Sequence, residues 1–319
     1  MTGDSKPMRP GMRPLDFVFL LRPPSLLPLW IFQLAAARSA AAFFGKRFPA
    51  FLVPSAVMRG LLAMTLVLAG GFILNQIVDR ESDRANRKLF FLADGIISLR
   101  AAWVELWLLW VAGALVSLTL PAAFRLVLLV SLALNATYSA PPLRAKARAP
   151  LDLVWNGLGF GFAACAAGWT SVGPLRGPWA GPALAYALAV AGVIASTTIP
   201  DIEGDLRAGL RTTGVALGAR RTSLLALALL VAGAAVGWAS NDLLGFYGPL
   251  LSLPLLLRAH ATQSRPHRVM ANQVAVGLFA LVAGVRAPLL LALLAIVYFG
   301  TRAYYRARFG MSFPGRGTP

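Results

Sequence analysis

Half of the acidic residues of this chain lie in two short windows that share the pattern D-x-E-x-D. Residues 79–83 read Asp-Arg-Glu-Ser-Asp and residues 201–205 read Asp-Ile-Glu-Gly-Asp, and each window follows a long apolar run. Residues four apart share one face of a helix, so the outer aspartates of each window would present two carboxylates side by side. Asn75 extends the first of these faces by one more turn.

Paired carboxylates at this spacing point to a hard divalent cation. Like charges four residues apart destabilise a helix by about 0.2–0.5 kcal/mol, so each pair needs a counter-charge. Neither window contains His or Cys, and Mg²⁺ typically binds one or two carboxylates and fills its shell with water and phosphate oxygens. We therefore predict that Asp79, Asp83, Asp201 and Asp205 bind Mg²⁺ and a phosphate-bearing ligand. The alternative is that these acids pair with neighbouring arginines in solvated loops.

A third polar segment, residues 138–146, supplies positive charge. It reads Tyr-Ser-Ala-Pro-Pro-Leu-Arg-Ala-Lys, and its two prolines would stop a helix. Arg144 and Lys146 are suited to binding phosphate oxygens, Arg144 in a bidentate manner. For this loop taken alone, the ordinary excess of basic residues beside membrane spans is the simpler explanation.

The composition indicates a membrane protein rather than a soluble domain. Apolar residues make up 58% of the chain and charged residues only 13%, against about 25% charged in soluble domains. A membrane-spanning helix needs about 20 mostly apolar residues. Candidate spans are 25–44, 51–78, 98–118, 122–138, 151–170, 178–200, 222–240, 243–258 and 272–304, the last with a break near 285–288. We predict an all-α fold, one polytopic transmembrane bundle over residues 1–319 with nine or ten helices.

Basic residues predict the orientation of this bundle. The formal charge is +18, and Lys and Arg gather at the N-terminus and at residues 79–90, 139–149, 203–221 and 258–268. The positive-inside rule places these segments, and with them both aspartate windows, on the cytoplasmic side of an inner (plasma) membrane. Because membrane orientation explains the charge, we expect no nucleic-acid partner. Residues 1–15 would form a cytoplasmic N-terminal segment. The basic tail at 305–319 would lie outside with nine spans and inside with ten.

Taken in order, these segments resemble the UbiA family of intramembrane prenyltransferases. Asn75, Asp79 and Asp83 fit an N-x-x-x-D-x-x-x-D signature, and residues 201–205 fit the second aspartate motif of the family. Further similar segments are the Y-S-x-P-P-x-R-x-K loop at 138–146, the Leu-Arg-Pro-Pro opening at 21–24 and the polar start of the fifth helix at 152–157. The resemblance covers roughly residues 15–225.

The resemblance implies a chemistry and a fuller set of site residues. Family members are helical bundles, commonly of nine helices around a central cavity, that bind an isoprenyl diphosphate through Mg²⁺ held by both aspartate motifs. They pass the prenyl group to a lipophilic acceptor, often an aromatic ring, within membrane lipid. The implied catalytic set is Asn75, Asp79, Asp83, Asp201, Asp205, Arg144 and Lys146. The implied substrate-binding set is Arg22, Arg87, Lys88, Tyr138 and Asn156.

Two departures from the family pattern bear on the identity of the acceptor more than on binding of the prenyl donor. Many members carry an arginine where this chain has Phe90, and Lys88 would then supply the missing cation. A charged K-D pair before the second motif is replaced by Thr-Thr-Ile-Pro at residues 197–200. Prenyl chain length stays open, as does the choice among a quinone-precursor ring, a glycerol-phosphate lipid, a tetrapyrrole and a carotenoid as acceptor. Two other functions also stay open: a terpene cyclase that uses prenyl diphosphate alone, and a non-enzymatic transporter or lipid-binding protein.

Overall fold

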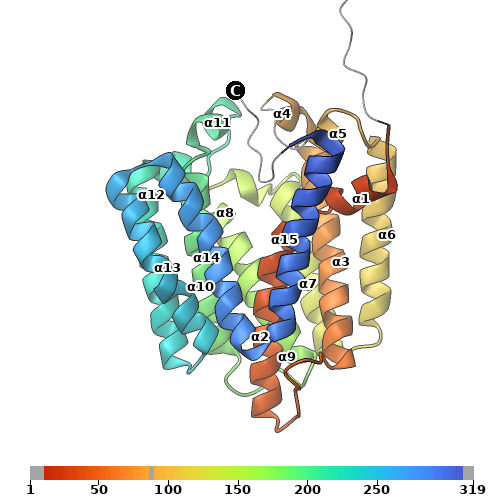
Figure 1. Cartoon of the computed structure of the whole chain (residues 1–319), viewed down its shortest axis with the longest axis vertical. Helices are drawn as coiled ribbons and strands as arrows, with labels where there is room; N and C mark the ends of the chain where they lie inside the picture. Colours follow the sequence, from red (N-terminus) through yellow and green to blue (C-terminus); the bar gives the residue numbers. More distant parts are fainter. Residues whose placement is uncertain (1–10, 86–89, 312–319) are drawn as a thin grey trace, which may run out of the picture.

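The protein is a bundle of long helices, seen in a computed structural model that describes residues 11–85 and 90–311 (Figure 1). Ten helical segments of this part are 17 residues or longer, which confirms the all-α class. They are α2 (Leu27–Phe43), α3 (Ser55–Val78), α6 (Leu99–Ser117), α7 (Ala122–Ser139), the continuous run of α8 (Leu151–Asn156), η3 (Gly157–Ala163) and α9 (Ala164–Thr170), α10 (Ala180–Thr198), α12 (Thr213–Ala239), α13 (Leu243–Thr262), α14 (Arg265–Arg286) and α15 (Pro288–Phe309).

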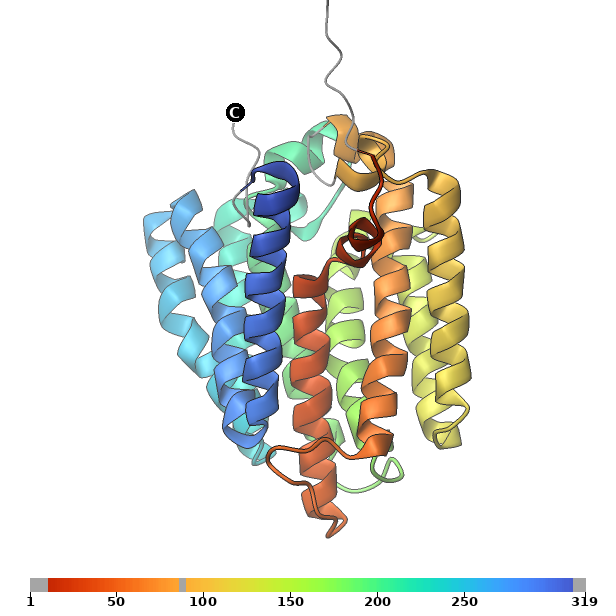
Figure 2. The same ribbon diagram turned by 45° about the vertical axis from the view of Figure 1, so that its right-hand side comes forward.

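Short helices lie at the ends of these long ones. They are α1 (Pro14–Leu20), η1 (Pro23–Leu26), α4 (Arg80–Ala85), α5 (Phe90–Ala93), η2 (Ala145–Ala147) and α11 (Ile202–Arg207). Figures 1 and 2 show α1, α4, α5 and α11 gathered at one end of the bundle, the end at which α15 also finishes. The segments that carry the aspartate windows therefore lie on one side of the molecule.

Eight helices of the described chain are long and apolar enough to cross a membrane. The outer surface agrees with this, because large apolar side chains face outward where a soluble protein would carry charge. On α6, for example, Trp107 is 56% exposed and Leu108 is 65% exposed. These side chains belong in lipid, and the helices behind them contribute to two buried apolar clusters.

The last predicted span, 272–304, is in fact two helices. Helix α14 ends at Arg286, Ala287 leaves helical geometry with φ −135° and ψ 71°, and Pro288 begins α15. A proline is favoured at the first turn of a helix, where its missing N–H is not needed. The break near 285–288 is thus confirmed, and ten long segments bring the end of α15 back to the side of α1.

Close contacts between helices depend on small residues, as is usual in membrane bundles. A Cβ atom at Gly168 of α9 would lie 2.1 Å from the carbonyl oxygen of Gln33 on α2, and one at Gly161 of η3 would lie 2.5 Å from the Ala187 backbone on α10. Any side chain at either position would push the helices apart. The central helices α2, α9 and α10 are therefore held at fixed separation around the interior.

Candidate active site

The first aspartate window lies at the end of α3 and continues it by a helical turn. Helix α3 ends at Val78, and the backbone N–H of Asp79 still donates to the carbonyl of Asn75 at 2.9 Å. The N–H of Asp83 donates in turn to the carbonyl of Asp79 at 2.7 Å. These i to i+4 bonds keep Asn75, Asp79 and Asp83 on one face, as their spacing predicts.

Asp79 is paired with the two cations of the loop at 138–146. Arg144 donates from Nη2 to Asp79 Oδ1 at 3.2 Å, and Lys146 Nζ binds Asp79 Oδ2. Asn75 donates from Nδ2 to Ser139 Oγ at 3.1 Å, which adds a second contact between the window and this loop. The partners of Asp79 thus come from a loop some sixty residues away, whereas the alternative interpretation had named adjacent arginines.

The local backbone and burial shape this ion pair. Arg144 has a left-handed conformation with φ 43°, which turns the chain directly after Pro141 and Pro142 and starts η2. The side chain of Lys146 is only 10% exposed. Burial lowers the pKa of Lys146 from its ordinary value, and the charge and hydrogen bond of Asp79 oppose that effect only in part.

The second window covers the start of the short helix α11 and is tied to the start of α12. The N–H of Asp205 donates to the carbonyl of Asp201 at 2.8 Å, so these two aspartates again share a face. Asp205 Oδ2 accepts a hydrogen bond from Thr212 Oγ1 at 2.8 Å. The next residue, Thr213, donates from its N–H and its hydroxyl to the buried carboxylate of Asp152 on α8, at 2.7 and 2.5 Å.

A short backbone pairing joins the residues after the cationic loop to the segment that follows the second window. The N–H of Arg211 donates to the carbonyl of Ala147 at 3.0 Å, and the N–H of Ala149 donates to the carbonyl of Arg211 at 2.8 Å. Residues 147–149 therefore run beside the segment that leads from α11 into α12. The loop that carries Arg144 and Lys146 contacts the first window through side chains, and the residues directly after it contact the segment that follows the second window through backbone.

The possible metal ligands of the two windows suit a hard cation, because they are carboxylate and amide oxygens. Neither window contains His or Cys. Among the described residues, however, no three His, Cys, Asp or Glu side chains lie close enough together to hold one metal ion. Mg²⁺ needs only one or two protein carboxylates when phosphate oxygens and water complete its shell. The assignment of Asp79, Asp83, Asp201 and Asp205 as its ligands stays a prediction.

A cavity of about 410 Å³ opens beside the first window and runs into the bundle. Its polar end contains Arg22, Asn75, Tyr138, Asn156 and Thr197, so three of the five predicted substrate-binding residues line it. Asn156 donates from Nδ2 to Tyr138 Oη at 3.1 Å and to the Asp152 carbonyl at 2.7 Å. The guanidinium of Arg22 lies over the Phe72 ring, 5.5 Å from its centre.

Some predicted residues lie outside the described part, and some lining residues were not predicted. Arg87 and Lys88 belong to the first group. Asn135 and Asn272 belong to the second, since both line the cavity from within the long helices α7 and α14. A polar residue within a membrane span is a general signal of function, and it was the one available clue to these two asparagines.

Comparison with known proteins finds similarity both in sequence and in fold. The sequence profile of the UbiA prenyltransferase family matches residues 26–273. The chain is 33% identical to the digeranylgeranylglyceryl phosphate synthase of Halobacterium salinarum, over 61% of this chain and 68% of that one. It is 32% identical to the chloroplastic 2-acyl-4-prenylphloroglucinol 6-prenyltransferase of Humulus lupulus, over 48% of this chain but only 40% of the relative.

A solved structure has the same fold. It is a UbiA homologue from Archaeoglobus fulgidus bound to DMAPP and Mg²⁺, with a TM-score of 0.63 and 22% identity. The similarity covers 88% of this chain and 99% of the homologue.

Proposed function

The chain belongs to the UbiA prenyltransferase family, and from this premise we propose that it transfers a prenyl group from an isoprenyl diphosphate to a lipophilic acceptor inside the membrane, with Mg²⁺. One observation carries the proposal. Asp79, ion-paired with Arg144 and Lys146, lies one helical turn beyond Asn75, which lines the polar end of an apolar cavity. This arrangement suits a ligand with an anionic head and a hydrocarbon tail.

The charged end would bind and stabilise the diphosphate. Bound Mg²⁺ would neutralise negative charge on the phosphates as the bond between the allylic carbon and oxygen breaks. The aspartates of both windows, with Asn75, are the groups available to hold the ion. Arg144 and Lys146 already contact Asp79, so they reach any anion bound beside it and would stabilise the departing diphosphate.

The apolar cavity would protect the carbon skeleton during transfer. Water would capture an allylic cation, so the walls must exclude it, and residues such as Leu68, Phe72 and Val193 provide such walls. Tyr138 and Asn156 are hydrogen-bonded to each other at the polar end, where they would orient the acceptor. The reaction balances when the allylic carbon bonds to the acceptor, diphosphate leaves and the acceptor loses a proton.

We base the proposed acceptor class on the relatives and the proposed orientation in the membrane on the distribution of basic residues. One relative is named for a phloroglucinol substrate and the other for a glyceryl phosphate product, so we propose an aromatic or lipid acceptor. The end that carries the aspartate windows also carries Arg148, Arg211, Arg258 and Arg265. By the positive-inside rule we propose that this end faces the cytoplasm of an inner membrane.

The test is Mg²⁺-dependent release of diphosphate by the purified protein in lipid nanodiscs. We would supply labelled allylic diphosphates with lipid extract as the acceptor source, and analyse products by mass spectrometry. Asp79→Ala should abolish release, whereas Glu203→Gln, a change at an exposed acid in the middle of the second window, should not. A wild-type protein that releases no diphosphate with any donor would contradict the proposal. Products formed from the donor alone would identify a cyclase.

A further inference from the structure

The cavity has a definite depth, set along α3. Its lining residues on that helix are Met64, Val67, Leu68, Gly71, Phe72 and Asn75, which follow the pattern i, i+3, i+4, i+7, i+8, i+11 and so form one face. From Asn75 to Met64 this face is about 16 Å long, at roughly 1.5 Å of rise per residue. The cavity therefore extends from the charged end well into the membrane interior.

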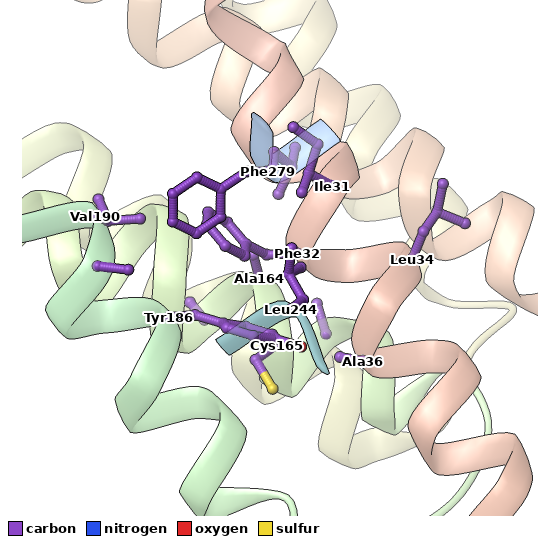
Figure 3. Close-up of a cluster of buried hydrophobic side chains, with 14 of the residues drawn as sticks. Ile31, Phe32, Leu34, Ala36, Ala164, Cys165, Tyr186, Val190, Leu244 and Phe279 are labelled. Carbon is purple, nitrogen blue, oxygen red and sulfur yellow. The ribbon is translucent and has the colours of Figure 1, made fainter. Parts of the chain in front are cut away.

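Two phenylalanines lie at the deep end. Phe32 is the deepest lining residue of α2 and Phe279 the deepest of α14, and their rings meet edge to face with centres 5.7 Å apart. Each side chain is 4% exposed. The ring of Tyr186 packs on Phe32 with centres 4.8 Å apart, and Figure 3 shows Phe32 between Phe279 and Tyr186. Phe32 and Phe279 thus line the deep end of the cavity, and Tyr186 packs behind Phe32.

This floor is held rigidly from behind. A Cβ atom at Gly248 of α13 would lie 2.5 Å from the Phe279 ring, so the ring is seated directly against that helix. Behind Phe32 the buried cluster continues with Tyr186, Ala164 and Cys165, which are all fully buried. Phe279 lies against α13 and Phe32 packs on Tyr186, and in a closely packed interior these contacts restrict movement of both rings away from the cavity.

We propose that Phe32 and Phe279 limit the prenyl chain length of the donor by blocking the deep end of the cavity. This inference rests on the proposed function, because it assumes that the diphosphate binds at the aspartate end. The volume of about 410 Å³ is near the lower end of the roughly 300–1,000 Å³ typical of ligand sites, and it must hold the tail and part of the acceptor. The chain therefore selects a short allylic diphosphate.

Removal of either ring should lengthen the preferred donor. We would measure kcat/KM for dimethylallyl, geranyl, farnesyl and geranylgeranyl diphosphate with wild type, Phe32→Ala and Phe279→Ala. We expect the preference for a longer over a shorter donor to rise at least tenfold in each variant. Val193→Phe, which adds a ring higher in the cavity, should shift the preference toward shorter donors. Phe299→Ala removes an exposed ring on α15 and should leave the ranking unchanged.

A second set of measurements keeps the inference testable if an alanine variant misfolds or turnover is absent. Phe32→Leu and Phe279→Leu remove less volume, and binding of non-reactive thiolodiphosphate analogues of the same four lengths ranks the donors without turnover. An unchanged ranking in folded variants would overturn the inference. If the ranking shifts in binding but the wild type transfers no prenyl group, the proposed function fails while the inference stands.

Discussion

Asp152 and Thr213 are 61 residues apart in sequence and joined by two hydrogen bonds, from the N–H of Thr213 at 2.7 Å and from its hydroxyl at 2.5 Å. Asp152 is 3% exposed and Thr213 is 2% exposed. The pair fixes the start of α12 against α8. Because Thr212 binds Asp205, the same pair also fixes the position of the second aspartate window.

We expect Thr213→Val to weaken both stability and Mg²⁺ use. The change keeps the shape of the side chain but removes one hydrogen bond to a charged group, a loss of about 1.5–3 kcal/mol. Asp205 would be held less firmly, so the Mg²⁺ concentration for half-maximal diphosphate release should rise more than the KM for the donor. Thr119→Val, on an exposed hydroxyl at the opposite end, is the matched control. Equal losses of activity at all Mg²⁺ concentrations would argue for a merely structural role.

Removing either cation that binds Asp79 should lower kcat/KM, and the two losses should not be additive. Lys146→Met should lower kcat/KM by about 10²-fold or more, the usual effect of removing one donor to a developing anion. Arg144 and Lys146 bind the same carboxylate, so the double variant should lose less than the product of the single losses. Steady-state kinetics with a fixed donor measure this. Arg221→Gln, an exposed basic residue on α12, is the control, and simple additivity would refute the shared site.

Metal removal should stop the reaction without unfolding the protein. Chelation is expected to reduce diphosphate release to background and added Mg²⁺ to restore it, while the thermal unfolding of the helices changes little. Asp83→Asn should raise the Mg²⁺ concentration required, because Asp83 lies one turn beyond Asp79 on the same face. Full activity in the presence of excess chelator would remove the metal from the proposed mechanism.

Short-range structural features could be predicted from the sequence because they depend on residues that are close together in the chain. The face formed by Asn75, Asp79 and Asp83 and the break at Pro288 are of this kind. The predicted span from residue 222 lies in the long part of α12, because Gly218 interrupts that helix with a non-helical φ of 73° and ψ of 165°. The short helical segment from Thr213 to the break carries no long apolar run, so hydropathy gives no signal for it.

Contacts across the bundle could not be predicted, because local patterns such as residue spacing and hydropathy do not report the distance between remote segments. The pairing of Lys146 with Asp79 depends on the left-handed turn at Arg144, and the floor of the cavity depends on how α2 and α14 approach each other. Phe32 and Phe279 are ordinary apolar residues in apolar helices. Their position at the end of a cavity emerges only from the packing.

The contact between the two ends of the chain provides the last prediction. Asp16 on α1 is fully buried and accepts hydrogen bonds from Tyr304 Oη and from Arg308, whose Nε and Nη2 lie 3.1 Å from its two oxygens. The Phe19 and Tyr304 rings stack with centres 3.7 Å apart. This contact joins α15 to α1, and η1, which follows α1, supplies Pro24 and Ser25 to the lining of the cavity.

Asp16→Asn should therefore loosen α15 and also impair the polar end of the cavity. The amide cannot accept on both sides as the carboxylate does, so Arg308 or Tyr304 would lose a buried partner. We expect a lower thermal melting temperature, faster proteolysis after the arginines of α15 and a raised KM for the donor. Arg306→Gln, on an exposed neighbour in the same helix, should change none of these. If Asp16→Asn lowers the melting temperature without altering KM, the contact stabilises the fold but does not shape the cavity.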